Sequence, residues 1–197
     1  MKYFCLTGII AAFVLLAGCK KGSEHLPEEG AMKLIELNDT QVLPGDFFYL
    51  DLDSNGVRDF VFRQSEYFSV VEQAMKLDFS INSYRHSFVL SPPTDYLPPL
   101  AAGVRVKNKT GEDLVWCNLS QLNLVTKSTF AETGLSTWAG SWINKTHQYI
   151  PVKIYSTDNK TYLGWIEASM DINAEIITLH RAALSTVAEK EVKTGEL

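Results

Sequence analysis

The chain is short of cysteine, histidine and basic residues. It has three cysteines and four histidines, and its 18 Lys and Arg are outnumbered by 23 Asp and Glu, for a net charge of −5. So few thiols exclude a disulfide-rich scaffold. The excess of acidic over basic residues argues against a protein that binds the phosphates of a nucleic acid. The histidines show neither HExxH nor another paired metal-ligand spacing, so we expect no zinc site. Stability must therefore come from the packing of a core, for which 197 residues give room in one domain.

Catalytic motifs are also lacking. Ser141 stands in AGSWI, without the GxSxG surroundings of a nucleophile elbow. Cys117 lies in the apolar run LVWCNL, where a small core residue is the ordinary interpretation. A pair of carboxylates for glycoside hydrolysis cannot be read from sequence, and nothing marks one here. We therefore expect a non-enzymatic protein.

The N-terminus has the composition of a secretory signal peptide. Lys2 is followed by an apolar run from Ile9 to Leu16, which is too short to cross a bilayer as a helix of about 20 residues. We predict that residues 1–18 are a signal peptide.

The end of this segment is more specific. Leu16-Ala17-Gly18-Cys19 resembles a bacterial lipobox, in which the cysteine thiol carries diacylglycerol. The resemblance implies that Cys19 is lipidated and anchors the protein to a membrane of the bacterial envelope. Lys20 stands where an Asp would resemble an inner-membrane retention signal, so the outer membrane or the cell surface is favoured. Residues 19–32, rich in charge with Gly and Pro, are expected to form a flexible tether.

Residues 33–197 are predicted to form one all-β domain, a jelly-roll-like β-sandwich. Short runs rich in β-branched and aromatic residues recur between Asn, Asp, Gly, Ser and Pro, and no long helical repeat interrupts them. In YIPVKIYS the apolar Ile150, Val152 and Ile154 alternate with other residues, as in a half-buried strand. The expected strands are KLIEL, DFFYLDL, DFVFR, FSVVEQ, KLDFSI, HSFVL, VRVKN, DLVWCNL, YIPVKIYS, YLGWIEASM and EIITLHR.

Three connecting segments are also predicted. Thr157-Asp158-Asn159-Lys160 has the composition of a tight hairpin turn, because Asp and Asn tolerate positive φ. The segment 91–103 holds four of the seven prolines, which indicates a surface crossover. Residues 182–197 are expected to form a short helix or an irregular tail.

The stretch DLDSNGVRDF, residues 51–60, spaces its oxygen-bearing groups as a calcium loop does. Side-chain oxygens at positions 1, 3 and 5 of a tight loop, a carbonyl at position 7 and a carboxylate at position 9 can converge on one cation. These places are filled in order by Asp51, Asp53, Asn55, Val57 and Asp59.

Two interpretations of this stretch remain open. Phe62 occupies the place of the bidentate Glu of an EF-hand, so the pattern instead resembles the DxDxNGxxDF loops that join strands in extracellular repeats of the FG-GAP type. The alternative is a polar turn in which Asn55-Gly56 supplies the bend and the Asx side chains bond their own backbone. Three carboxylates so close together repel one another without a cation, which favours a structural Ca²⁺ of weak affinity.

The order of features from Asp51 onward resembles a group of secreted or anchored bacterial β-proteins of unknown function. That group shows a DxDxNGxxDF-like loop, a GxW-type segment, a YGWI-like strand and a terminal Gly-Glu. The corresponding stretches here are DLDSNGVRDF, STWAGSW, YLGWIEASM and TGEL, with Leu163 where the group usually has an aromatic residue. The resemblance implies an envelope lipoprotein with a β-sandwich, and it implies no activity.

These observations predict a surface or outer-membrane lipoprotein that binds or scaffolds another macromolecule, a protein or a glycan. The alternative is a carbohydrate-binding or carbohydrate-active surface protein, because exposed aromatic rings stack on sugars. Trp138, Trp142 and Tyr149 are the candidate ligand surface for that alternative. The competing interpretation of these three residues is that they belong to the core.

Overall fold

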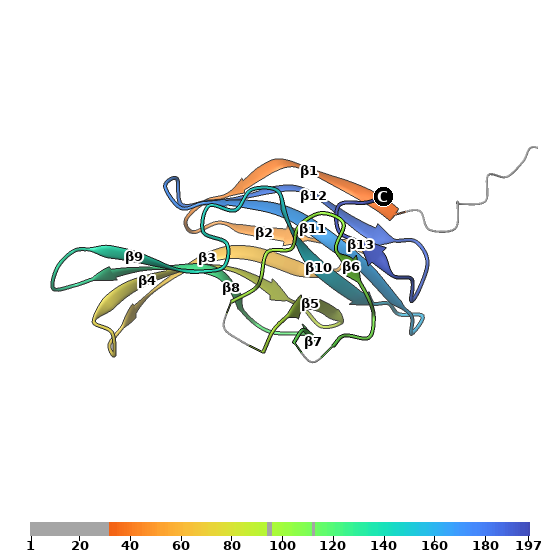
Figure 1. Ribbon diagram of the computed structural model, residues 1–197, viewed down its shortest axis with the longest axis horizontal. Coiled ribbons are helices and arrows are strands. Elements are labelled where there is room, and N and C mark those ends of the chain that lie inside the picture. The colour runs from red at the N-terminus through yellow and green to blue at the C-terminus, as the bar shows by residue number, and fades with distance from the viewer. Residues whose placement is uncertain (1–31, 94–95, 112) are drawn as a thin grey trace, which may run out of the picture.

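The computed structural model describes residues 32–93, 96–111 and 113–197. Within these ranges the protein is all-β, with antiparallel strands in two main sheets and no helix, which confirms the predicted sandwich (Figure 1). The first sheet has six strands in the order β1-β12-β11-β10-β5-β7. Its strands are β1 (Met32–Val42), β12 (Ile176–Ser185), β11 (Thr161–Asp171), β10 (Gln148–Tyr155), β5 (Ser87–Ser91) and β7 (Val115–Cys117).

The second sheet has five strands in the order β2-β3-β4-β8-β9, and a further pair, β13-β6, stands apart. The five strands are β2 (Phe47–Leu50), β3 (Phe60–Ser69), β4 (Ala74–Ser83), β8 (Leu122–Phe130) and β9 (Ser136–Gly140). The pair consists of β13 (Val192–Lys193) and β6 (Arg105–Val106).

The core lies between the two main sheets. The inward face predicted for β10 is confirmed, because Ile150, Val152 and Ile154 are all buried in the main core cluster. The strand is not half-buried as predicted, since Tyr149 and Pro151 on its other face are buried too. The inward residues meet residues of the five-stranded sheet such as Phe62 and Phe79, which are also fully buried. Neither sheet can bury its apolar face alone, so this contact is what holds the sandwich together.

The outer face of the six-stranded sheet carries a smaller apolar cluster. Tyr149 and Trp165 meet edge to face with ring centroids 5.3 Å apart, next to the buried Ala183. The C-terminal segment covers this cluster, since Trp165 Nε1 donates to the carbonyl oxygen of Glu196 at 3.2 Å. The predicted helix or irregular tail is therefore wrong in part: residues 182–185 continue β12, and the chain adds the short strand β13 before its end.

Among the other local predictions, the hairpin turn is confirmed and the strand assignments are wrong in part. The turn at 157–160 is confirmed, with Asn159 at φ 61° and its N–H donating to the Ser156 carbonyl at 3.0 Å. FSVVEQ was expected to be a strand, but Val70 and Val71 lie in the turn of the β3–β4 hairpin. Strands β8 and β9 were not expected at all.

The two ends of the sandwich differ. The start of β1 and the C-terminus lie at one end, whereas the β3–β4 and β8–β9 hairpins project from the opposite end (Figure 1). In the described part of the chain, no helix has the length and apolar character to cross a membrane. The predicted signal peptide, the lipidation of Cys19 and the tether up to residue 31 fall outside the described residues.

Candidate calcium loop between β2 and β3

The stretch DLDSNGVRDF connects β2 to β3, as the resemblance to strand-joining loops implied. The two strands pair up to Leu50 and Phe60, and the Asp59 N–H donates to the Leu50 carbonyl at 2.8 Å. The ladder therefore closes the loop at its base and holds its first and last residues side by side.

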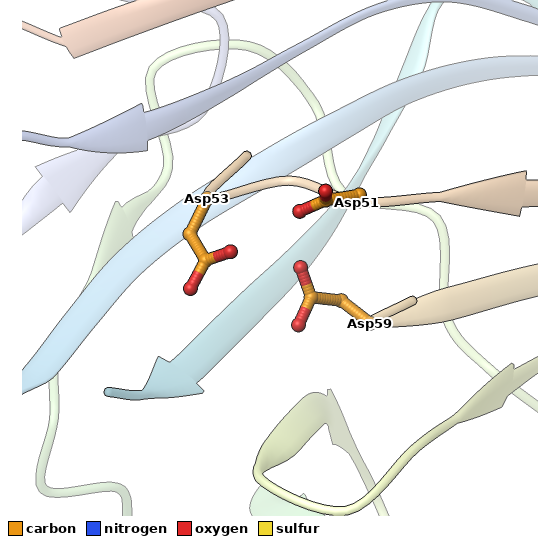
Figure 2. Close-up of side chains that lie close together, drawn as sticks. All are labelled: Asp51, Asp53 and Asp59. Carbon is orange, nitrogen blue, oxygen red and sulfur yellow. The ribbon is translucent and has the colours of Figure 1, made fainter. Parts of the chain in front are cut away.

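Three carboxylates converge inside this loop. Asp51, Asp53 and Asp59 each offer one oxygen, and these oxygens all lie within 4.8 Å of one another. Figure 2 shows the three side chains pointing toward one another from the two arms of the connection. Hard carboxylate oxygens at such spacing are the ligand type that Ca²⁺ takes, at about 2.3–2.6 Å from the ion.

The backbone is wrapped around these carboxylates. Asp51 accepts hydrogen bonds from the N–H groups of Asn55 at 3.1 Å and Gly56 at 2.8 Å, and Asp53 also accepts from Asn55 at 3.1 Å. Gly56 has φ 83° and Ser54 has φ 64°, so the sharp bend falls where a glycine and a small polar residue permit it. These are the bonds of the Asx turn that the polar-turn interpretation predicted, and they also hold the carboxylates in one place.

The other two predicted ligands are placed differently. The side-chain oxygen of Asn55 accepts from the Val57 N–H at 2.7 Å, while its Nδ2 donates to Asp53 at 2.9 Å. Asn55 thus positions the Asp53 carboxylate and turns its own oxygen to the backbone. The structure brings together the three carboxylates of the predicted set, while the Asn55 side chain supports Asp53 and accepts from the Val57 N–H.

Asp59 is the most constrained member of the set. Its side chain is buried, and Oδ2 accepts from the Leu52 N–H at 2.7 Å. Burial raises the pKa of Asp59 to about 6; the hydrogen bond from Leu52 opposes this rise, and the charges of Asp53 and Asp51 add to it. Burial likewise raises the pKa of Asp53 above its ordinary value, opposed by the backbone hydrogen bond from Asn55 and increased by Asp51. A cation at the centre would remove the repulsion that contributes to both shifts.

A lysine reaches the loop without neutralising it. Lys33, at the start of β1, donates to the Ser54 hydroxyl at 2.6 Å and to the Asp53 carbonyl oxygen at 3.4 Å. Both acceptors are uncharged. These two bonds therefore tie β1 to the loop and do not involve a carboxylate. This contact could not be predicted from the sequence, because Lys33 and Ser54 are 21 positions apart.

A solvent cleft of about 180 Å³ opens beside the loop. Asp53 and Asp59 line it from one side and Arg85 and Tyr155 from another. The cleft gives an ion a route from solvent to the carboxylates, so the three oxygens could hold a cation.

The aromatic candidates do not form one surface. Trp142 is fully buried, with Nε1 donating to the Leu97 carbonyl at 2.9 Å, and Tyr149 is buried against Trp165. Trp138 alone is half-buried, on β9, where its ring lies 5.7 Å from that of Phe79. Two of the three rings therefore present no face to a sugar, because they are occupied by the core and by the C-terminal cover.

The described residues also include one free cysteine and two stacked histidines. Cys117 is half-buried against the core, and burial raises the pKa of its thiol, which opposes a thiolate nucleophile. His147 and His180 stack with ring centroids 4.1 Å apart, a contact that was not predicted from the sequence.

No family model, curated protein or solved structure matches the chain.

Proposed function

We propose that this protein is a calcium-stabilised β-sandwich module of the bacterial cell envelope, anchored through a lipid on Cys19, that binds another macromolecule. The observation that supports the calcium part is the convergence of Asp51, Asp53 and Asp59 within 4.8 Å at the β2–β3 connection. The anchor rests on the lipobox-like Leu16-Ala17-Gly18-Cys19, and an outer-membrane or surface position rests on Lys20.

The ion would have a structural role. The Asp59 carbonyl oxygen accepts from the Tyr84 N–H at 2.9 Å and from the Ser87 hydroxyl at 2.5 Å, so the loop is already joined to the β4–β5 turn. Lys33 joins it to β1 as well. A cation bound by the three carboxylates would therefore stiffen the end of the sandwich at which the chain from Cys19 enters.

The binding role is supported by the opposite end of the molecule. At the tips of the β3–β4 and β8–β9 hairpins, Val70, Val71 and Leu135 are 71 %, 95 % and 67 % exposed. Exposed apolar side chains gathered at one end of a domain are typical of interaction sites. Because the chain enters at the other end, these tips would face away from the membrane, toward a protein or glycan partner (Figure 1).

The calcium part is tested by thermal melting of the full chain in mild detergent, in EDTA and in a few millimolar CaCl₂. A ligand that binds only the folded state stabilises it by about 1.4 kcal/mol at ten times its Kd, which raises Tm by a few degrees. Extracellular sites of this kind have Kd of about 10⁻⁴–10⁻³ M, so millimolar calcium suffices.

Two variants make the test specific. Asp53→Ala removes one carboxylate of the cluster and should abolish the rise. Asp158→Ala is the matched control, because Asp158 also accepts a backbone bond in an exposed turn, from the Lys160 N–H at 3.1 Å, but lies in the β10–β11 hairpin. A wild-type Tm that is the same in calcium and in EDTA would leave DLDSNGVRDF a polar turn and remove the calcium from the proposal.

A further inference from the structure

A second polar cluster lies on the outer face of the six-stranded sheet, where three strands lie side by side. The Ser169 hydroxyl on β11 lies 2.7 Å from His180 Nε2 on β12, and His180 Nδ1 lies 2.6 Å from Asp39 Oδ1 on β1. We propose that Ser169 is a nucleophile, with His180 as its general base and Asp39 as the residue that orients the imidazole, in a site that cleaves small acyl esters. Such a constellation is recognised by the geometry and roles of its members, in any chain order.

Two irregularities in neighbouring strands bring the three residues together. The β11–β12 register shifts beside Glu167, so that His180 stands as an extra residue in β12. The β1–β12 register shifts between Glu36 and Thr40, and Asp39 within that bulge has φ 53°. Bulges re-aim side chains, and Asp is one of the few non-glycine residues that adopt positive φ readily, so Asp39 can hold its place in the bulge. Both distortions fall on members of the proposed site.

The hydrogen-bond geometry accommodates the tautomer that the role needs. With its proton on Nδ1, His180 donates to Asp39, and its Nε2 then accepts from the Ser169 hydroxyl. The Ser169 oxygen also accepts from the backbone N–H of His147 at 2.9 Å, which polarises the hydroxyl. A hydroxyl oxygen has two lone pairs, so one remains for an electrophile.

The site opens to solvent. The Asp39 side chain is 77 % exposed and that of His147 is 65 % exposed, while the His180 side chain between them is only 13 % exposed. The His180 imidazole is therefore shielded from solvent, whereas the Asp39 and His147 side chains at the rim of the site are accessible. With Asp39 and His147 exposed at its rim, the site would admit small acyl esters from solvent.

Glu167 and Arg181 hold the His147 side chain in place beside the proposed site. Its Nδ1 bonds the buried Glu167 at 2.8 Å, and Glu167 also accepts from Arg181 Nε at 2.5 Å. Although burial raises the pKa of Glu167, the bonds from Arg181 and then His147 hold it below its ordinary value. Glu167 therefore stays ionised and fixes the His147 ring against His180, where it is a positioning residue.

The reaction proceeds in two balanced steps. The Ser169 oxygen forms a bond to the acyl carbon of the ester while its proton passes to His180 Nε2, and the bond to the alkoxy group breaks as that group takes the proton. Water then attacks the acyl-serine, gives its proton to His180, and releases the carboxylic acid as Ser169 recovers its proton.

The test uses the full chain in mild detergent with an alkyl fluorophosphonate, which forms an Oγ–P bond and loses fluoride. We expect the adduct mass on the intact protein and on the peptide that contains Ser169, without need of a variant. Turnover of p-nitrophenyl acetate should accompany it, in EDTA as in calcium, because the site does not use the β2–β3 loop.

Variants separate a catalytic role from a structural one. Ser169→Ala should abolish labelling, and His180→Gln should slow it by about 100-fold or more. Ser136→Ala is the matched control, since Ser136 is an exposed strand serine whose recorded partner is the Thr129 hydroxyl at 2.8 Å. Asp39→Asn, which keeps the size of the side chain and its tolerance of positive φ, should slow labelling with little change in Tm. An unlabelled wild type, or labelling that survives in Ser169→Ala, would overturn the proposal.

Discussion

Asp59 Oδ2 accepts a hydrogen bond from the Leu52 N–H at 2.7 Å, so a buried carboxylate is tied to the backbone of the strand connection that it closes. The bond orients the carboxylate toward Asp51 and Asp53 without neutralising its charge (Figure 2). A buried carboxylate beside two others should respond to protons and, if the proposed ion binds, to calcium, and the first prediction concerns the protons.

The loop should give the apo protein an unusual pH dependence. Because the folded pKa of Asp59 is about 6, above its ordinary value of 3.8, the folded state binds a proton more tightly than the unfolded chain. The free energy of unfolding contributed by this group is therefore largest below about pH 4 and falls as pH rises through 6. In EDTA, the difference in Tm between Asp59→Asn and wild type should grow in favour of the variant from pH 4 to pH 7.

Calcium should reverse this difference. The proposed ion would bind the ionised carboxylate, so wild type should gain Tm with pH in calcium while Asp59→Asn loses the response. A pH profile of Asp59→Asn parallel to that of wild type in EDTA would show that Asp59 does not titrate in this range.

The buried Glu167 should have the opposite pH signature. Since its pKa is held below the ordinary value in the folded state, the stability it contributes is present above the unfolded pKa and is lost as pH falls through the folded one. Glu167→Ala also leaves Arg181 without its 2.5 Å partner, so we expect a loss of about 1–3 kcal/mol at pH 7. Urea unfolding at pH 7 and at pH 4 measures both effects, and a variant whose loss is equal at the two pH values would contradict the assignment.

Gly164 should not tolerate a side chain. A Cβ at this position of β11 would overlap the backbone carbonyl oxygen of Ala183 on the paired strand β12. We expect Gly164→Ala to lower the free energy of unfolding by about 1–3 kcal/mol, as overpacking does. Gly111→Ala is the control, because nothing lies within 4 Å of a Cβ there; equal melting of the two variants would contradict the close approach.

Trp142 should behave as a core residue in any test of sugar binding. Its ring is fully buried and its Nε1 donates to the Leu97 carbonyl, so Trp142→Ala should cost about 3–5 kcal/mol. A glycan array probed with Trp138→Ala, whose ring is half-buried, is the fairer test of the aromatic alternative. If Trp142→Ala kept its wild-type Tm and lost glycan binding, the core assignment would be wrong.

Cys19→Ala should release the protein from the envelope. If the thiol carries diacylglycerol, wild type incorporates labelled palmitate and fractionates with membranes, whereas the variant does neither. Cys117→Ala is the matched control and should keep both the label and the membrane fraction. Label in Cys19→Ala would show that the lipid is attached elsewhere.

Several features could be predicted from sequence because their causes are local. The shared inward face of Ile150, Val152 and Ile154 follows from the two-residue period of a strand, and the turn at 157–160 follows from residues that accept positive φ. Local preference also misled, since Val70 and Val71 favour strands and yet form a hairpin tip. There the pairing of β3 with β4 decides where the chain must turn.

The all-β class and the oxygen spacing of DLDSNGVRDF follow from local sequence, because strand periodicity and a tight loop involve residues only a few positions apart. The remaining features depend on contacts between distant parts of the chain. The burial of Trp142 depends on Leu97, 45 positions away, and the meeting of Asp39 with His180 spans 141 positions and two bulges. Such contacts depend on strand register, which is set by the packing of whole sheets, so no short stretch of the sequence encodes them.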